Sequence, residues 1–397
     1  MPVPSSRQRR LAALLAASVA LSAAPISAYT CLDESGSPVD WFVGLPSGSD
    51  SPGYYYVDSN TVKGGFVLSP YGLDVTSGGS IMSTVNQLYG LSNVTGTVYA
   101  AWNDDPPTGQ SVSSTYAHAK GVLLSSGVSG FWLVHSKPAW PNAISQGAAP
   151  FPDLTYAQSV MCVTLDPADV DNVAAVQTVN FPYIYDSILT PDLADEFPHF
   201  GTFVSKTKTT KTSITTALDS TAGWSSPVDL MAIGKGYKWG KDLYEDLVSP
   251  TLGDSLYVET WRDGAGGRMP SFCPGSTAVD TRPVNYTVYF VNDVTMPDGV
   301  SWTGTKDHSK WAVTMGTSAG ASKWACVGDI NRMCSQESRG GGTLCMQDDD
   351  LWEAFTNAVS GYDACWDYDV CQTSYQCYWC PPVVDQFTAL LRGGGKQ

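Results

Sequence analysis

The sequence predicts a fold of mixed strands and helices, of the α/β or α+β class, built from two related lobes. Short runs of strand-forming residues recur along the chain, separated by Gly, Ser, Pro and Asp, and this is the pattern of strands joined by turns. Segments that favour helices are mixed with these runs. A His-x-Lys motif occurs at 118–120 and again at 308–310, and such a distant recurrence indicates two related lobes.

The first lobe is expected to contain several strands and one helix. The strand-like runs lie at 39–43, 54–57, 97–102, 121–124 and 131–135. Residues 81–91 form the helix expected among them. The strands are short and are separated by Gly, Ser, Pro and Asp, as is typical of strands joined by turns.

The second lobe is also expected to mix strands and helices. Strands are predicted at 256–261, 284–291 and 310–315, and a helix is predicted at 351–359. Residues 232–248 are expected to be partly helical. The stretch at 205–213, SKTKTTKTS, is polar and basic, and it indicates a loop.

The first 28 residues have the organisation of a secretory signal peptide. Three arginines precede an apolar run at 11–24, and a small-residue cleavage site follows at 26–28. After removal of residues 1–28, the two lobes are expected at 29–170 and 171–397, the second with a Cys-rich tail. No other apolar run approaches the ~18 residues that a membrane span needs. We therefore expect a soluble product of the secretory pathway with no membrane partner.

The cysteines and sequons fit an exported protein. The chain has 10 Cys, and an even number in an exported protein most simply means disulfides. Cys377 and Cys380 form a C-x2-C motif that would favour zinc inside a cell, but the signal peptide favours disulfides. Two N-x-T sequons, at Asn93 and Asn285, are expected to carry glycans if the host attaches them.

The charge of the chain restricts how it can bind a polyanion. The formal net charge is −16 at pH 7. Binding a polyanion at neutral pH is then difficult unless a local cleft is basic. Acidic pH eases binding, because carboxylates take up protons near pH ~4 while histidines become charged. The composition therefore permits a polyanionic substrate most readily in an acidic compartment.

The two His-x-Lys motifs carry the main chemical signal. On a strand, residues i and i+2 face the same side, so His118 pairs with Lys120 and His308 with Lys310. If the two faces meet, the lysines can neutralise phosphodiester oxygens while one histidine attacks and the other protonates the leaving oxygen. The alternative is that these are ordinary polar residues at strand entries. His135 begins a third His-x-Lys and could return to the same cleft through a hairpin, although a lone histidine is more often structural.

Other motifs give weaker signals. Residues 316–320, GTSAG, match the nucleophile elbow of α/β-hydrolases, a fold in which the catalytic histidine follows the serine. Every histidine here precedes Ser318, so we expect a small-residue loop instead. The aspartates at 348–350 suit the first turn of the following helix, and no H-x-x-x-H spacing is present. We therefore expect neither a metal site nor a cofactor.

Several stretches of the chain resemble deoxyribonuclease II, a family of acid endonucleases with a phospholipase-D-like fold. The resemblance spans essentially the whole chain after residue 28. It is carried by PVDWFV at 38–43, NDDPP at 103–107, HAKGVLL at 118–124, GFWLVHS at 130–136, DHSKW at 307–311, CVGDINR at 326–332 and RGGGTLC at 339–345. Ala119 departs from the family pattern, in which a hydroxyl residue usually stands there, but it leaves both reacting groups in place.

The resemblance implies metal-independent hydrolysis of DNA at acidic pH, leaving 3′-phosphate and 5′-hydroxyl ends. It implies a pseudo-twofold chain in which both His-x-Lys motifs build one site. The catalytic residues would be His118, Lys120, His308 and Lys310. His135 would support them, and Asn331, in a Gly-x-x-Asn stretch, would bind phosphate.

The resemblance also implies a disulfide scheme. The family's pairs map onto Cys31–Cys162, Cys273–Cys365 and Cys326–Cys345. The cysteines outside that scheme are Cys334, Cys371, Cys377 and Cys380. We expect these four to form two additional bridges near the C-terminus.

The mechanism we expect has two steps, with His118 as the nucleophile that forms a phosphohistidine and His308 as the acid. Lys206, Lys208 and Lys211 are candidate contacts to the DNA backbone, with a solvated loop as the alternative. Two other functions stay open: a phospholipase or phosphodiesterase of the same superfamily, and a secreted DNA-binding protein without catalysis. The expected location is the lysosome, another acidic compartment, or the medium, as a monomer or homodimer.

Overall fold

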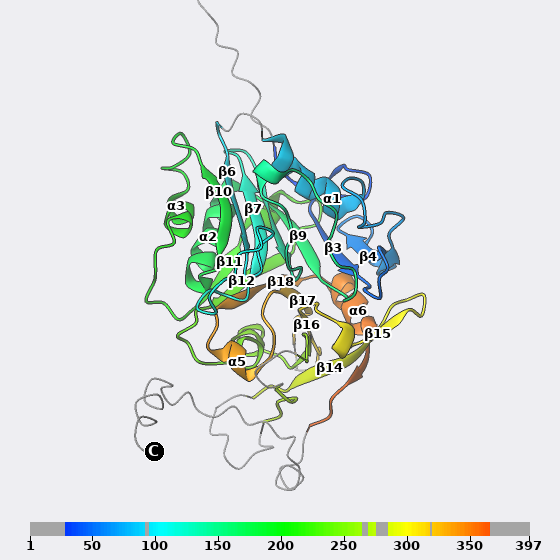
Figure 1. Cartoon of the computed structure of the whole chain (residues 1–397). Helices are drawn as coiled ribbons and strands as arrows, with labels where there is room; N and C mark the ends of the chain where they lie inside the picture. The colour runs from blue at the N-terminus through cyan, green and yellow to red at the C-terminus, as the bar shows by residue number, and fades with distance from the viewer. Residues whose placement is uncertain (1–27, 92–94, 264–268, 275–284, 318–319, 366–397) are drawn as a thin grey trace, which may run out of the picture.

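The computed structural model of this chain describes residues 28–91, 95–263, 269–274, 285–317 and 320–365. Residues 1–27 of the predicted signal peptide, and Asn93, lie outside these residues. Two large sheets organise the described part of the chain (Figure 1), and a small hairpin of β1 (Cys31–Leu32) and β2 (Pro38–Val39) adjoins them. The predicted mixture of strands and helices is confirmed.

The first sheet has eight strands, and all its neighbouring strands are antiparallel. In order across the sheet these are β10 (Ile184–Leu189), β6 (Val98–Asn103), β7 (Lys120–Ser125), β8 (Gly130–His135), β9 (Val160–Leu165), β3 (Trp41–Pro46), β4 (Tyr54–Asp58) and β5 (Val67–Leu68). Every residue of β6, β7 and β8 is buried. Both faces of these strands are covered, which explains their continuous apolar runs.

The second sheet has nine strands and one parallel pair, β13 with β14. Its strands in order are β11 (Ser213–Leu218), β12 (Asp229–Lys235), β18 (Gly341–Gln347), β17 (Trp324–Gly328), β16 (Trp311–Thr314), β13 (Leu256–Glu259), β14 (Val288–Thr295) and β15 (Ser301–Thr303), with β19 (Val359–Tyr362) also pairing with β14. The strands predicted in this lobe are confirmed, with the second shifted to begin at Val288.

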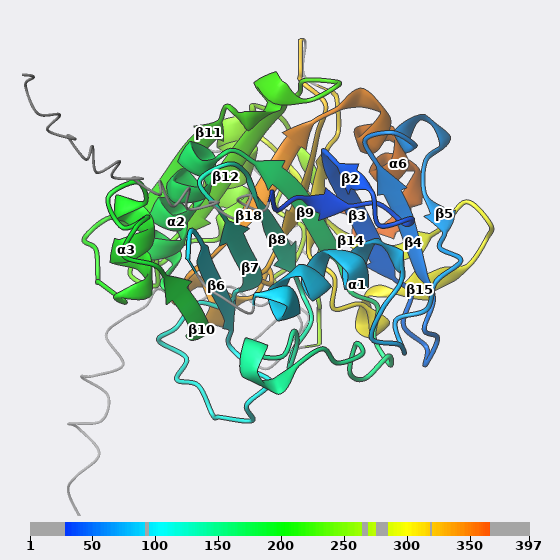
Figure 2. The ribbon, with the colours of Figure 1, turned by 90° about the horizontal axis from the view of Figure 1, so that it is seen from above.

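Helices cover the sheets and fill the space beside them. They are α1 (Gly79–Asn86), α2 (Pro167–Asn180), α3 (Pro198–Val204), the π-helical turn Tyr244–Val248, α4 (Ser249–Leu252), α5 (Cys334–Glu337) and α6 (Asp349–Ala358). Figure 2 shows α2 and α3 together near β6 and β10, with α6 at the opposite end of the molecule. Asp348 caps α6 by accepting from the Leu351 N–H (2.8 Å), as the aspartate run predicted.

The main core lies between the two sheets. Val43 of β3 and Leu123 of β7 belong to the same buried cluster as Val313 of β16 and Leu344 of β18. Helix α2 contacts strands of both sheets, and β8 contacts β17. Since each buried aliphatic side chain contributes about 1.5–3 kcal/mol, this shared core fixes β7 and β16 relative to each other. These are the two strands that follow the His-x-Lys motifs.

Residues 232–248 are partly helical, as predicted, but the strand at the start of the stretch was not predicted. Residues 229–235 form β12, which lies between β11 and β18, and only the end of the stretch, at Tyr244–Val248, is helical. The stretch at 229–235 forms a strand because its residues pair with strands on both sides, whereas single-sequence propensity takes no account of distant partners.

The boundary between the lobes, expected at residue 170, falls inside α2, and β10, which follows α2, belongs to the first sheet.

All three predicted disulfides are confirmed. They are Cys31–Cys162, Cys273–Cys365 and Cys326–Cys345. Cys326 and Cys345 face each other on β17 and β18, where the Cα atoms are 4.0 Å apart. Cys334 is also disulfide-bonded, while Cys371, Cys377 and Cys380 lie outside the described residues. Asn285, one of the two sequon asparagines, is exposed just before β14.

Arg332 is buried between two acidic side chains. Its Nη2 donates to Glu245 (2.9 Å), and its Nε lies 3.7 Å from the Asp242 carboxylate. Arg332→Met removes this cation from buried carboxylates, so we expect the free energy of unfolding to fall by about 3–5 kcal/mol. Urea denaturation measures the loss. Lys323→Met breaks an exposed pair with Asp349 and should cost less than about 1 kcal/mol; equal losses in the two variants would contradict the prediction.

Candidate active site

Each His-x-Lys motif is anchored by a segment that belongs to the opposite sheet. His118 precedes β7 of the first sheet, and its backbone N–H donates to the carbonyl of Gly340, at the entry of β18 (2.9 Å). His308 precedes β16 of the second sheet, and its N–H donates to the carbonyl of Ala157 (2.8 Å). The Lys310 N–H donates to Ser159 Oγ (3.0 Å). These reciprocal contacts bring the two motifs to the same edge of the paired sheets.

The two lysines lie at the start of their strands and are buried. Lys120 is 2% exposed and Lys310 is 3% exposed. Burial, together with the charge of Lys120, lowers the pKa of Lys310 to about 7. The lysines therefore interact across the boundary between the sheets, and the site concentrates positive charge in a chain whose net charge is strongly negative.

The two histidines respond to the lysine of the opposite motif as well as to their own. Burial lowers the pKa of His118 well below its usual range. The Asp104 carboxylate raises that pKa, but the charges of Lys120 and Lys310 act in the same direction as burial. Burial and the charges of Lys310 and Lys120 lower the pKa of His308 to about 3. Both imidazoles are therefore neutral at pH 7. The structure brings together the four residues predicted to act in catalysis.

His118 lies beside an acidic side chain. Its Nε2 is 3.8 Å from Asp104 Oδ2. Asp104 also pairs with the Lys120 ammonium and with Arg339 Nη2 (3.1 Å). Burial raises the pKa of this carboxyl, but the surrounding charges of Lys120, His118 and Arg339 outweigh burial and hold the pKa well below its usual range. Asp104 is therefore a permanent anion that orients one histidine and two cations.

His308 is held by aromatic rings instead. The Tyr156 ring stacks on the imidazole with centroids 4.1 Å apart and planes at 16°. The Trp261 ring lies 4.2 Å away, tilted by 45°. These contacts fix the plane of the imidazole and reduce its exposure to water. Each histidine also has a buried nitrogen, Nδ1 of His118 and Nε2 of His308, with no hydrogen-bond partner in the described part of the chain.

His135 ends β8 and lies next to the same site. The β7–β8 hairpin pairs Gly121 with Val134, which places His135 alongside the Lys120 end of β7. Its Nδ1 accepts from the Lys137 N–H (3.2 Å), and its ring packs edge-on against Trp140 (5.1 Å). Burial and the charge of Lys120 lower its pKa. The hairpin return predicted from the sequence is present.

The stretch after β17 supplies further polar groups. The Gly328 N–H donates to the carbonyl of Lys310 (2.8 Å), so this stretch adjoins the second motif. Asp329 is buried and accepts from the Gly342 N–H (2.8 Å). Burial raises its pKa to about 7, although that hydrogen bond lowers it. The Oδ1 atom of Asn331 is buried and has no hydrogen-bond partner among the described residues.

Comparison with known proteins identifies the family. The family model for deoxyribonuclease II matches residues 30–365. This chain belongs to the deoxyribonuclease II family. It is 35% identical to deoxyribonuclease-2-alpha of Sus scrofa over 86% of this chain and 92% of that protein. It is 33% identical to plancitoxin-1 of Acanthaster planci (85% and 93% covered) and 31% identical to cell death-related nuclease 6 of Caenorhabditis elegans (84% and 89%).

Membership in the deoxyribonuclease II family makes this chain a deoxyribonuclease, which is a hydrolase. Sequence reasoning missed several residues that shape its site: Asp104, Arg339, Asp329, Tyr156 and Trp261. Three of them did carry a signal, since Asp104, Asp329 and Arg339 lie in stretches that resemble the family. In the described residues no group of three or more His, Cys, Asp or Glu side chains is arranged to hold a metal ion, and no helix there is long and apolar enough to span a membrane.

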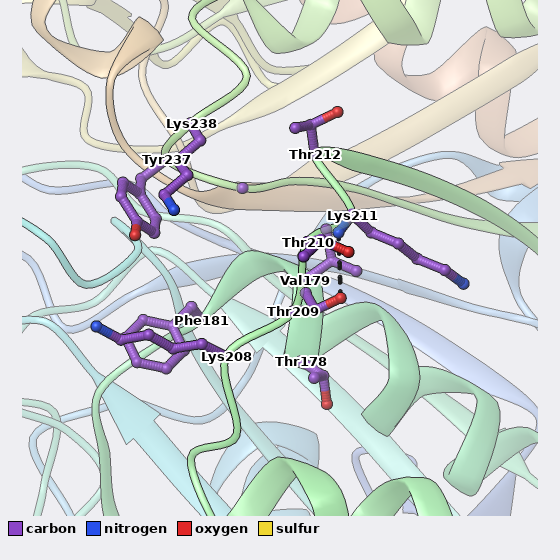
Figure 3. Close-up of a pocket in the computed structure, with 11 residues that line it drawn as sticks. Thr178, Val179, Phe181, Lys208, Thr209, Thr210, Lys211, Thr212, Tyr237 and Lys238 are labelled. Atoms are coloured by element: carbon purple, nitrogen blue, oxygen red, sulfur yellow. Dashed lines mark hydrogen bonds between the residues drawn. The ribbon is translucent and has the colours of Figure 1, made fainter.

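The lysine-rich loop lies between α3 and β11. Lys208 and Lys211 line a pocket together with Phe181, Tyr237 and Lys238 (Figure 3). Lys208 lies over the Phe181 ring, whereas Lys211 points away from it. All the lysines of this loop, Lys206 included, are exposed.

Proposed function

We propose that this deoxyribonuclease is a metal-independent acid endonuclease that uses both His-x-Lys motifs as one site. The observation that carries the proposal is the pair of reciprocal backbone hydrogen bonds by which each motif joins the opposite sheet, from the His118 N–H to the Gly340 carbonyl and from the His308 N–H to the Ala157 carbonyl. In keeping with this geometry, Lys310 lowers the pKa of His118 and Lys120 lowers the pKa of His308. Each motif thus lies within electrostatic reach of the other. A phosphodiester placed between them would meet two ammonium groups, one nucleophilic imidazole and one acid. We also propose that the two lobes are related by the pseudo-twofold arrangement of phospholipase-D-like enzymes.

In the first step, neutral His118 attacks the phosphorus atom. A P–N bond forms and the bond from phosphorus to the 5′ oxygen breaks. The His308 imidazolium gives its proton to that oxygen, so the downstream strand leaves with a 5′-hydroxyl. The lowered pKa of His118 suits its role as nucleophile, because the ring stays neutral at acidic pH. The pKa of His308 is about 3, so the acid in this step is the minor imidazolium fraction of His308, which grows as the pH falls.

In the second step, water attacks the phosphohistidine. Neutral His308 takes a proton from the water as the O–P bond forms, and the P–N bond to His118 breaks. The upstream strand leaves with a 3′-phosphate, and both histidines return to their starting states. Lys120 and Lys310 stabilise the negative charge on the non-bridging oxygens in both steps. The side-chain amide N–H of Asn331 would donate to the phosphate, and His135 would support Lys120.

Three further features suit digestion of DNA in an acidic compartment. The predicted signal peptide and the confirmed disulfides suit the secretory route. The acidic composition disfavours DNA binding at neutral pH. We therefore propose the lysosome, a similar compartment or the medium as the place of action.

The deciding experiment incubates plasmid with the purified mature protein in excess EDTA, at pH about 5 and pH about 7.5. A folded His118→Ala/His308→Ala variant is the control. Cleavage at the acidic pH with 3′-phosphate ends, absent from the control, is the expected result. Failure of the folded, oxidised protein to cut DNA in EDTA would refute metal-independent cleavage, and a parallel assay on phospholipid vesicles would test the lipid alternative.

A further inference from the structure

A second group of cations lies outside the catalytic site, and each of its members is placed over an aromatic ring. The Nζ atoms of Lys206 and Lys208 lie 5.4 Å and 5.7 Å from the ring centroids of Tyr183 and Phe181. On the next loop, Lys238 and Lys241 lie 5.5 Å and 5.6 Å from the rings of Tyr237 and Trp239. We call these four lysines and their four rings the lysine–aromatic surface.

The two loops that carry this surface are adjacent. The Gly236 N–H donates to the carbonyl of Thr212 (2.8 Å), which joins the loop at 205–212 to the loop at 236–241. Figure 3 shows the Phe181 and Tyr237 rings on the same side of the pocket, with Lys208 and Lys238 beside them. A lysine seated over a ring face loses less freedom when it binds an anion than one that moves freely in water.

The local charge is opposite to that of the whole chain. The loops at 205–212 and 236–241 contain five lysines and no carboxylate, whereas the chain has a net charge of −16. All five of these lysines are exposed. A surface of this kind is the local basic region that a strongly acidic protein needs in order to hold a polyanion.

The surface is continuous with the catalytic site through Tyr116. The Tyr116 ring stacks on Phe181 (5.2 Å, 5°) and lies edge-on to Tyr183 (5.3 Å). The backbone N–H of Ala117 donates to the Phe181 carbonyl (3.0 Å), and His118 follows directly in the chain. Arg339, which pairs with Asp104 in the site, also donates to the carbonyls of Tyr116 and Ala117. A chain of aromatic and cationic groups thus leads from His118 to Lys206 and Lys208.

Two backbone positions on this surface are strained. Phe181 has φ +61° and Lys206 has φ +54°, in the left-handed region that large side chains rarely adopt. In Phe181 this conformation ends α2 and turns the ring toward Tyr116 and Lys208. Such strain costs of order 1 kcal/mol or more and is concentrated at functional positions. The strain at Phe181 is explained if the ring must lie where Lys208 can pack over its face.

We propose that the lysine–aromatic surface binds the phosphate backbone of the DNA that flanks the scissile bond on the His118 side. This inference rests on the proposed nuclease function and adds a substrate requirement to it. The catalytic site then needs only one phosphodiester, while the surface holds the duplex beyond it. Long DNA is therefore a better substrate than a minimal diester, and the difference depends on salt because each phosphate contact releases counterions.

The test compares two substrates at pH about 5. Plasmid DNA spans both regions, whereas the p-nitrophenyl ester of thymidine 3′-phosphate reaches only the catalytic site. The variant carries Lys206→Gln, Lys208→Gln, Lys238→Gln and Lys241→Gln. We expect its KM for plasmid to rise about tenfold or more, with a shallower salt dependence, by up to about 0.9 in the log–log slope for each lost phosphate contact. Its kcat/KM for the ester should be unchanged.

Two single variants serve as matched controls. Lys323 also lies over a ring, that of Trp352 (4.8 Å), but it pairs with Asp349 on another surface, so Lys323→Gln should leave plasmid cleavage unchanged. Lys211 is on the same loop and points away from the aromatic rings. A loss in Lys211→Gln as large as in Lys208→Gln would overturn the role of the seated lysines.

The outcomes separate this inference from the proposed function. If the wild type cleaves both substrates and the quadruple variant has an unchanged KM and salt slope on plasmid, the surface does not bind DNA. If the wild type cleaves neither substrate in EDTA, the proposed function itself fails. Thermal denaturation of the quadruple variant confirms that it is folded, as expected for substitutions of exposed side chains.

Discussion

His308→Ala is expected to lower cleavage of plasmid DNA by at least about 10²-fold, because the variant has no acid for the 5′ oxygen. The same variant should still attack the p-nitrophenyl ester of thymidine 3′-phosphate, since that leaving group departs as a stable anion without a proton. It should release p-nitrophenolate in a burst of up to one equivalent. Turnover should then stop at the phosphohistidine, because the variant also lacks the base that activates water. Mass spectrometry of the stalled protein should find the phosphoryl group on His118.

His118→Ala should behave differently on the same ester. Without the nucleophile no phosphohistidine can form, so neither burst nor adduct is expected, and plasmid cleavage should again fall by at least about 10²-fold. His199→Ala is the matched control, because His199 is 56% exposed on α3 and pairs with Asp171 away from both motifs. An adduct on His308 in the His118→Ala variant would reverse the two roles. A burst from neither variant would refute covalent catalysis.

The pairing within each proposed catalytic motif could be predicted from sequence because its signal is local. His118 with Lys120, and His308 with Lys310, each need only the two-residue period of a strand to share a face. The residues that tune them are not local. Asp104 reaches His118 across a neighbouring strand connection, and Arg339 arrives from the other lobe. No periodicity in the sequence around Asp104 or around Arg339 predicts these contacts, which depend on how the two sheets pack.

The helices and strands show the same difference between features with a local sequence signal and features that depend on packing. Strands β7 and β8 were predictable because they are short apolar runs bounded by turn residues. Helix α2 was missed, although it has Asp166 as its N-cap and Pro167 at its first position. Its buried residues surround most of its circumference because it packs against both sheets, so the one-sided apolar stripe by which a helix is recognised is absent. The identity of the packing partner, not the local sequence, determines that pattern.

The acidic environment proposed for this enzyme has a cost in stability. His118, His135 and His308 all have pKa values lowered by burial. The unfolded chain therefore binds more protons than the folded chain as pH falls below about 6.5, and the stability contributed by these neutral histidines is lost toward acidic pH. Asp329 acts in the opposite direction. Its raised pKa means that the folded chain holds a proton between about pH 4 and 7, so it adds stability at acidic pH.

The rate of DNA cleavage is expected to fall steeply between pH 5 and pH 7.5. The His308 pKa of about 3 means that the imidazolium fraction of the free enzyme decreases about tenfold for each pH unit above that value. Near pH 7 two further charges change in the same sense. Lys310, with a pKa of about 7, loses its positive charge, and Asp329, also with a pKa of about 7, becomes an anion. The first change weakens protonation of the leaving 5′ oxygen, and the other two weaken binding of the phosphate, so kcat/KM should fall by at least about 10²-fold across this range.

Asp329→Asn separates these contributions. The amide keeps the oxygen that accepts from the Gly342 N–H (2.8 Å) but cannot become an anion. At pH 5 the activity of the variant should match that of the wild type, since the Asp329 carboxyl is protonated and carries no charge at that pH. At pH 7.5 it should be several-fold more active than the wild type, because the phosphate no longer meets a buried carboxylate. The exposed neighbour of Asp104 supplies the control, since Asp105→Asn should leave the pH profile unchanged. Identical profiles for Asp329→Asn and the wild type would assign the whole alkaline decline to His308 and Lys310.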